Sequence, residues 1–254
     1  MSITPPSMPR RRLVVHLYSF SSTVVGLPVD LEHHLLHTSY TTTSALFLLL
    51  EAFLPLFLTI DWYQRSPSHR APRTFAMHWV VKNYLSTQEA QAERNRGRLF
   101  VLAHSAGGMH VCGFLFMPHM FSDSLVRRSL CGVAFIGVPF DIHRAKPAFR
   151  HAASQYYGNP KNARTNQPLS LLQGADAAYI ATFPPVKNIL AESEPRSVSS
   201  SSAAFVQKFR EKGGNITEHK AVGHDHMSPI LSLSTGIGEA WGEELAVWMT
   251  SSLN

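Results

Sequence analysis

The sequence predicts an α/β protein with a mostly parallel central sheet that is flanked by helices. Residues 99–103 and 131–139 are apolar without alternation, which is typical of strands buried on both faces. Segments with helical spacing of apolar residues, such as the one that carries Phe205 and Phe209, lie between such runs. No shift in composition marks a linker, so we expect a single domain over residues 1–254.

The predicted elements follow one another from an early strand to a closing helix. Pro55 separates a helix from a strand, and Gly213 and Gly214 end a later helix. Residues 140–185 are aromatic and punctuated by proline, so we expect a lid-like insertion of short helices where substrate is selected. We expect strands at residues 13–20, 56–62, 99–103, 131–139, 186–194 and 216–222, and helices at residues 44–54, 73–85, 106–117 and 240–249 and before Gly213.

The net charge of +6 and the isoelectric point near 9.5 would suit an anionic partner. The lysines and arginines are scattered and do not alternate with aromatic residues, so we expect no nucleic-acid binding. Cys112 and Cys131 lie in apolar runs, where cysteine acts as a small hydrophobic side chain, so no disulfide framework is expected. Residues 1–20 make a poor secretory signal. We therefore expect a reducing, cytoplasmic location.

The most apolar stretch, residues 45–60, carries Glu51 and Pro55 and is shorter than the ~20 residues that cross a bilayer. We interpret it as a buried helix followed by a buried strand and expect no stable membrane span. A membrane segment is the alternative interpretation.

His33 and His37 lie one helical turn apart, which is the spacing of a metal-binding pair. The residue after the first histidine is histidine rather than glutamate, so the zinc-protease pattern fails. We expect these histidines to be exposed, and we expect no metal and no organic cofactor.

Ser105 follows the predicted strand at residues 99–103 and precedes a predicted helix. Ala103 and Gly107, two positions before and after it, are small, as a G-x-S-x-G turn requires, with alanine in place of the first glycine. Such a turn raises the serine hydroxyl above the sheet edge and aims the N–H of Ala106 at a developing oxyanion. We interpret Ser105 as a nucleophile. The alternative is that the small residues only let the helix pack on the strand.

A serine nucleophile needs a base to take its proton and an acid to orient that base. His226 follows the last predicted strand and lies further along the loop than His224, so we predict His226 as the base and His224 as the alternative. Glu194 ends the preceding strand, and the gap to His226 accommodates one helix and one strand. We predict Glu194 as the acid, with Glu192 second and Asp176 third.

Two neighbours of these residues receive no catalytic role. Asp225 is adjacent in sequence to both histidines and is badly placed to orient either. His104 is adjacent to Ser105, and adjacent residues on a tight turn point apart, so we expect it to pack or hydrogen-bond nearby. A hydrogen-bonded loop or a metal-binding His-Asp-His is the alternative interpretation of residues 224–226.

Four motifs resemble those of α/β-hydrolases of the carboxylesterase and arylformamidase branch, particularly fungal members. The resemblance covers residues 44–250. It implies that Ser105 is the nucleophile, that Glu194 stands at the position of the acid, usually aspartate, and that His226 is the base. The motifs are Ala-His-Ser-Ala-Gly-Gly at 103–108, Gly-Val-Pro-Phe at 137–140, Tyr-Tyr-Gly at 156–158 and Gly-His-Asp-His-Met-Ser-Pro at 223–229, and residues 61–72 resemble the segment that precedes the serine.

One family feature is missing. The family places a His-Gly-Gly-Gly loop after an early strand to complete the oxyanion hole, and this sequence has no Gly-Gly before Gly107. The nearest equivalents, residues 15–18 or 19–22, do not allow the same close approach of the backbone. Residues 1–43 thus form a divergent segment of an N-terminally abbreviated fold. Because one oxyanion donor is typically worth about 10²–10³ in rate, we expect weak activity.

These observations predict a serine hydrolase with a catalytic triad that cleaves a carboxylic ester or an aryl formamide through an acyl-enzyme. The aromatic residues of the insertion favour a small-molecule substrate with an apolar or aryl group. The alternative is a catalytically impaired hydrolase-fold protein that binds a small ligand or a partner.

Overall fold

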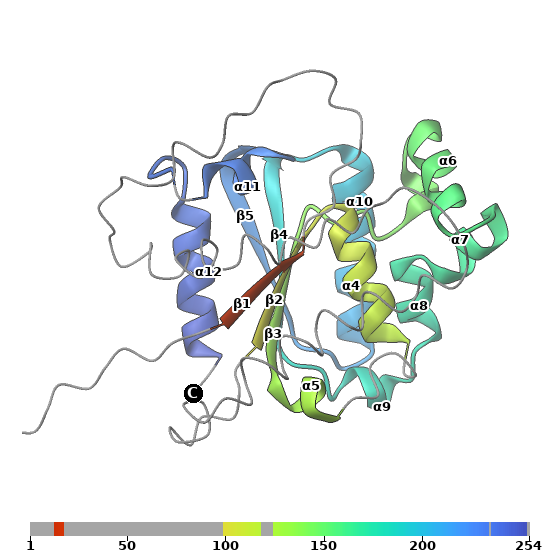
Figure 1. Cartoon of the computed structure of the whole chain (residues 1–254), viewed down its shortest axis with the longest axis horizontal. Helices are drawn as coiled ribbons and strands as arrows, with labels where there is room; N and C mark the ends of the chain where they lie inside the picture. Colours follow the sequence, from red (N-terminus) through yellow and green to blue (C-terminus); the bar gives the residue numbers. More distant parts are fainter. Residues whose placement is uncertain (1–12, 18–98, 118–123, 234, 253–254) are drawn as a thin grey trace, which may run out of the picture.

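The computed structural model describes residues 13–17, 99–117, 124–233 and 235–252, which are built around a five-stranded sheet. The strands lie side by side in chain order, and each neighbouring pair is parallel (Figure 1). The predicted parallel sheet flanked by helices is therefore confirmed. The strands are β1 (Leu13–Leu17), β2 (Leu99–His104), β3 (Leu130–Ile136), β4 (Val186–Ser193) and β5 (Ile216–Asp225).

The central strands are buried on both faces, which explains why their sequences do not alternate with polar residues. In β2, Val101 packs into one hydrophobic cluster and Leu102 into a second. In β3, Phe135 and Ile136 divide between the same two clusters. Successive side chains of a strand point to opposite faces, so the sheet separates two hydrophobic cores.

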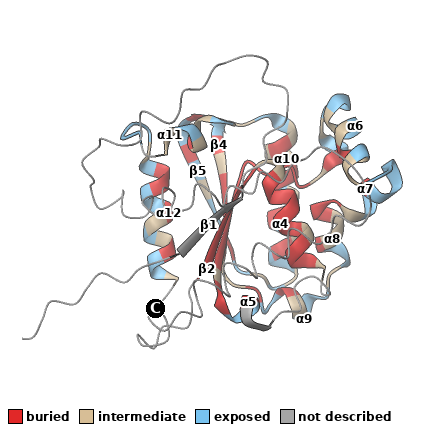
Figure 2. Ribbon diagram, in the orientation of Figure 1, coloured by how far each residue is buried: buried red, intermediate tan, exposed pale blue. Residues whose placement is uncertain are grey.

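Helices cover both faces of this sheet. The first core includes Phe114 of α4 (Ala106–Phe116) and Phe205 of α10 (Arg196–Glu211). The second core includes Trp241 of α12 (Ala240–Ser251), which lies on the other side of the sheet in Figure 1. Buried residues concentrate in the central strands and in α4 (Figure 2). Two short helices, α5 (Ser124–Ser129) and α11 (Ser228–Ser232), have no counterpart in the sequence-based prediction.

Between β3 and β4 the chain forms a series of short helices, as the prolines of residues 140–185 predict. Pro147, Pro160 and Pro168 each begin a helix, at the position where a missing N–H and a fixed φ are best tolerated. That these helices act as a lid stays a prediction. They are η4 (Ile142–Arg144), α6 (Pro147–Tyr156), α7 (Pro160–Asn166), α8 (Pro168–Gly174) and α9 (Ala177–Ile180).

Two strand ends differ from those expected. β3 ends at Ile136, before the predicted end at Pro139, because the next residue, Gly137, has a φ of 54° and leaves the extended conformation. β5 continues beyond the predicted end at residue 222, because Ser193 pairs with Asp225 after a register shift. Both ends lie at the carboxyl edge of the sheet.

Several predictions lie outside the described residues. They concern the helix at residues 44–54, the strand at 56–62, the helix at 73–85 and the pair His33 and His37. The strand predicted at residues 13–20 is described over Leu13–Leu17. In the ranges that the structure describes, no helix combines the length and apolar character that crossing a membrane requires.

Candidate active site

Ser105 lies in the turn between β2 and α4 with a strained backbone. Its φ of 51° and ψ of −126° make it the one non-glycine residue with positive φ among those described. Such a conformation costs about 1–3 kcal/mol and persists only where the surroundings hold it. The Ser105 N–H donates to the Ile136 carbonyl at 2.9 Å, and the Ser105 carbonyl accepts from the Gly108 N–H at 3.0 Å. The turn is therefore held by hydrogen bonds of the serine backbone itself.

Close packing around this turn explains its small residues. A Cβ atom on Gly108 would lie 2.1 Å from Val138 Cγ2, far inside van der Waals contact. Ala103, two positions before Ser105, is completely buried. Strand, helix and the loop after β3 thus meet here with no room for larger side chains.

The ring of His226 lies between Ser105 and Glu194. His226 Nε2 is 3.0 Å from Ser105 Oγ, and His226 Nδ1 is hydrogen-bonded to Glu194 Oε1. Because an ionised carboxylate can only accept, Nδ1 of a neutral ring carries the proton and Nε2 presents its lone pair to the serine hydroxyl. The structure thus brings together the three residues that the sequence predicts, although 121 positions separate Ser105 from His226.

Strand pairing places Glu194 beside this histidine. Glu194 follows the end of β4, and β4 pairs in parallel with β5, so the loop after β5 delivers His226 to the same edge. The Glu194 side chain is only 3% exposed, and its second oxygen accepts from the Ala191 N–H at 3.2 Å. Both carboxylate oxygens therefore have partners, as burial of a charge requires.

The loop that carries His226 is shaped by Asp225. Its Oδ1 accepts the N–H groups of Met227 at 3.0 Å and Ser228 at 2.9 Å. These bonds, chiefly the one from Ser228, lower the pKa of the Asp225 carboxyl because they stabilise the charged form. Asp225 has no hydrogen bond to the ring of His226 among the described residues, in line with its predicted poor placement.

His104 holds the same loop through the backbone of His226. It is 4% exposed, its Nε2–H donates to the His226 carbonyl at 2.8 Å, and the two rings lie 5.0 Å apart. Burial is the main cause that lowers the pKa of His104, and it favours the neutral form of the ring. His104, which the sequence predicts to pack or hydrogen-bond near Ser105, therefore supports the backbone of His226.

The alternative base and acids lie in other contacts. His224 Nε2–H donates to the Gly238 carbonyl at 2.8 Å, which leaves Nδ1 to accept from Ser228 Oγ at 3.0 Å. Glu192 accepts from the Gly223 N–H and pairs with Lys220, and these contacts lower its pKa. Asp176 caps the start of α9 by accepting from the Ala178 N–H. None of these contacts involves Ser105.

Gly137 belongs to the site but has no predicted role in the sequence. A Cβ atom there would lie 3.0 Å from His226 Nδ1 and 3.1 Å from Glu194 Oε2. Its positive φ and this lack of space both favour glycine. Gly137 lies within the strand predicted at residues 131–139, and the available signal was a glycine inside a strand pattern, which often marks a bend or a close approach.

The backbone next to Ser105 presents the positive end of the α4 helix dipole. Ala106 is the first residue of α4, whose eleven residues direct their N-terminal N–H groups toward this edge. β1 ends beside β2, with Leu17 paired to Ala103. Apart from Leu13–Leu17, the predicted divergent segment at residues 1–43 lies outside the described residues. Within the part of the chain that is described, no group of three or more histidine, cysteine or acidic side chains could hold a metal ion.

Solved esterase structures resemble this chain. The carboxyl esterase 2 TmelEST2 from the mycorrhizal fungus Tuber melanosporum has a TM-score of 0.52 and 17% identity over 76% of this chain and 66% of its own. An esterase from the archaeon Pyrobaculum calidifontis has a TM-score of 0.55 and 17% identity over 74% and 64%. EstE1, a thermostable carboxylesterase cloned from a metagenomic library, has a TM-score of 0.53 and 16% identity over 76% and 67%. No protein-family model and no curated protein matches the sequence.

The matched part spans about two thirds of the length of these esterases. At this level of identity the similarity establishes the fold and not the reaction. The parallel sheet, the helices on both of its faces and the strained turn after β2 agree with it. The described part of this chain therefore has the α/β-hydrolase fold of carboxylesterases.

Proposed function

We propose that this protein is a serine hydrolase that cleaves a carboxylic ester, or an aryl formamide, through an acyl-enzyme. The observation that carries the proposal is the 3.0 Å contact between Ser105 Oγ and His226 Nε2 on a strained turn. Strain of this kind at a half-buried turn needs a reason, and presenting a nucleophile supplies one. The carboxylesterase fold of the described chain supports the same reaction class.

In the first half of the proposed reaction, Ser105 Oγ attacks the carbonyl carbon while His226 Nε2 takes the hydroxyl proton. The carbonyl oxygen becomes an oxyanion that accepts a hydrogen bond from the Ala106 N–H. Glu194 stabilises the imidazolium through Nδ1–H. The tetrahedral intermediate then collapses, and the leaving alcohol or amine receives the proton from His226.

In the second half, His226 takes a proton from water, and the resulting hydroxide attacks the acyl carbon. Collapse breaks the bond to Ser105 Oγ, which recovers its proton from His226, and releases the carboxylic acid. Neither step requires a metal ion or an organic cofactor. His104 and Asp225 contribute by fixing the loop that carries His226.

An apolar or aryl group on the substrate fits the side chains beyond the turn. Ala106 packs against a cluster formed by Met109, Ile142 and Ala153, with Phe149 and Tyr157 at its edge. Most of these residues come from the insertion between β3 and β4. We therefore assign substrate selection to these helices, and propose that they act as the lid.

The missing His-Gly-Gly-Gly motif bears on the rate rather than the reaction class. With the Ala106 N–H as the one assigned oxyanion donor, we propose that activated esters are turned over slowly. We also propose that such esters acylate Ser105 more efficiently than stable amides are hydrolysed.

We propose a cytoplasmic location, which fits the two cysteines, since Cys112 and Cys131 are both thiols.

The test is labelling by a fluorophosphonate probe together with hydrolysis of a short p-nitrophenyl ester. The wild-type chain should be labelled and should turn over the ester, and Ser105→Ala should lose both. Ser199→Ala, on the exposed side of α10, is the matched control and should keep both. Labelling that survives Ser105→Ala would refute the assignment. Absence of labelling in the wild type would favour a hydrolase-fold protein that binds a ligand or partner.

A further inference from the structure

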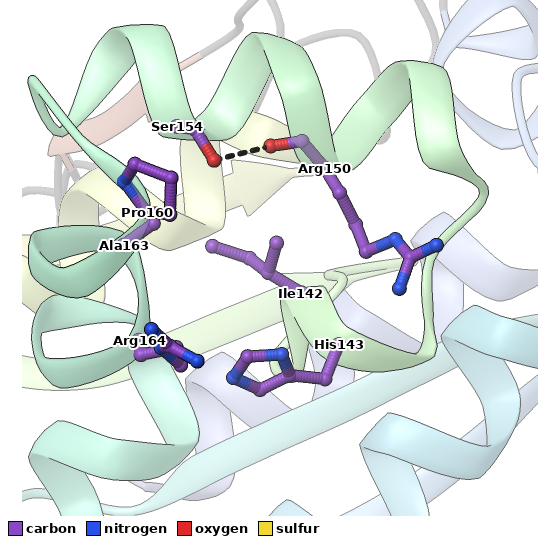
Figure 3. Close-up of a pocket in the computed structure, with 7 residues that line it drawn as sticks. All are labelled: Ile142, His143, Arg150, Ser154, Pro160, Ala163 and Arg164. Carbon is purple, nitrogen blue, oxygen red and sulfur yellow. Dashed lines mark hydrogen bonds between the residues drawn. The ribbon is translucent and has the colours of Figure 1, made fainter.

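A surface pocket separate from Ser105 lies among the short helices of the insertion. It has a volume of about 220 Å³ and lies between η4, α6 and α7 (Figure 3). Arg150 and Ser154 line it from α6, and Arg164 lines it from α7. His143 of η4 lies between the two arginine side chains in the view of Figure 3. Three side chains that can carry positive charge thus line one small hollow.

These three side chains have no acidic partner in the part of the chain that the structure describes. Among the described residues, no Asp or Glu forms an ion pair with His143, Arg150 or Arg164. The sequence itself explains this, since residues 142–175 contain no Asp or Glu at all. The same stretch contains five strongly basic residues, Arg144, Lys146, Arg150, Lys161 and Arg164. Among the described residues, Arg144 is the one member of this set with an acidic partner, Asp141 at 3.0 Å.

The base of the pocket is apolar and rigid. Ile142 and Ala163 line it, and each is only 4% exposed. The Ile142 N–H donates to Gln167 Oε1 at 2.7 Å, which ties η4 to the start of α8. A ligand there would meet an apolar surface on one side and exposed cationic groups on the other. This combination suits a molecule with an apolar body and an anionic end.

We propose that this pocket binds a small organic anion, with its carboxylate or phosphate group held by Arg150 and Arg164 and its apolar body on Ile142 and Ala163. Guanidinium groups recognise both anions through paired N–H donors. The local excess of positive charge raises the concentration of anions near the pocket. This inference goes beyond the proposed hydrolase reaction. The pocket shares Ile142 with the apolar cluster beside the turn, but Ser105 does not line it and no step of the reaction uses His143, Arg150 or Arg164.

Calorimetric titration of the full chain tests the proposal with three probes of similar size: phenyl phosphate, benzoate and benzyl alcohol. We expect phenyl phosphate to bind most tightly because it carries the larger charge, benzoate to bind more weakly, and neutral benzyl alcohol to give no measurable heat. The double variant R150Q/R164Q should weaken binding of phenyl phosphate by at least about tenfold, because both assigned anchors are lost.

The matched control is K146Q/K161Q. This variant also removes two positive charges, one at the start of α6 and one at the start of α7, at residues that do not line the pocket. We expect this control to change the affinity by less than about threefold. Thermal unfolding of both double variants, whose altered side chains are all exposed, checks that the fold is retained.

If the two double variants lost affinity for phenyl phosphate equally, the proposed pocket site would be overturned, because binding would then depend on general charge attraction. Binding of benzyl alcohol as tight as that of the anions would overturn the role of the arginines. Loss of phenyl phosphate binding in Ser105→Ala, or after fluorophosphonate labelling, would place the anion at the candidate active site instead. Retained binding in a chain without esterase activity would uphold the pocket and count against the proposed reaction alone.

Discussion

The carboxyl edge of the sheet and the helical insertion organise polar side chains in opposite ways. At the sheet edge, Ser105, His226 and Glu194 come from distant segments, and each polar group has a partner of matching chemistry. In the insertion, Arg150 and Arg164 are close in sequence, exposed and without an acidic partner among the described residues. The comparison indicates that the proposed reacting site is preorganised by the fold, whereas the proposed anion site is left open for its ligand to complete.

The largest effect that would sharpen this contrast comes from His226. His226→Gln removes the proposed base, so kcat/KM for a p-nitrophenyl ester should fall by about 10⁴-fold or more. His224→Gln is the matched control, since His224 makes its hydrogen bonds to Ser228 and Gly238. It should keep most of the activity while lowering the melting temperature. Equal activity losses in two folded variants would show that the preorganised contact is not the reacting one.

Gly137 provides a smaller effect at the same edge. Gly137→Ala places a methyl group 3.0 Å from His226 Nδ1 on a backbone with positive φ, so the histidine and glutamate are pushed apart. We expect a loss of about 1–2 kcal/mol in the free energy of unfolding and a fall of about tenfold in kcat. Chemical denaturation and initial rates measure the two quantities.

Gly174→Ala is the matched control for this change. A Cβ atom at Gly174 meets nothing within 4 Å, and the residue is the last of α8. The substitution should leave kcat unchanged and should not lower the free energy of unfolding. An equal fall in kcat for both variants would show that Gly137 does not act at the site.

The smallest effect concerns the pH dependence of stability. Burial lowers the pKa of His104 below its ordinary value of 6.5. Between the two pKa values the unfolded chain therefore binds a proton that the folded chain does not bind. The stabilising contribution of His104 is therefore complete above pH 6.5 and is lost as the pH falls from 6.5 through the lower folded pKa.

His104→Gln keeps an N–H donor for the His226 carbonyl but cannot titrate. The free energy of unfolding of this variant, measured between pH 8 and pH 5, should therefore fall less steeply with decreasing pH than that of the wild type. At pH 8, where the ring is neutral in both states, the two proteins should differ least in slope. A steeper fall in the variant would contradict the buried, neutral ring.

Much of the fold follows from local pattern. The unalternating apolar run of β2 and the small residues around Ser105 predict a doubly buried strand and a tight turn, and the structure has a buried strand and a turn with positive φ there. The prolines of the insertion predict short helices because each fixes a φ compatible with a first helical turn. The ends of β3 and β5 were misplaced because Gly137 and the shifted pairing of Asp225 depend on the neighbouring strands.

Periodicity and residue chemistry are local properties, so the alternation of strands and helices and the choice of Ser105, Glu194 and His226, with His224 as the alternative to His226, follow from the sequence. The distances follow from the tertiary structure, which brings His226 and not His224 to Ser105, bonds His104 to the backbone of His226 and places Gly137 beside the same contact. Parallel pairing decided this, since it carries the ends of strands far apart in sequence to one edge, where separations of a few ångströms depend on register and loop packing.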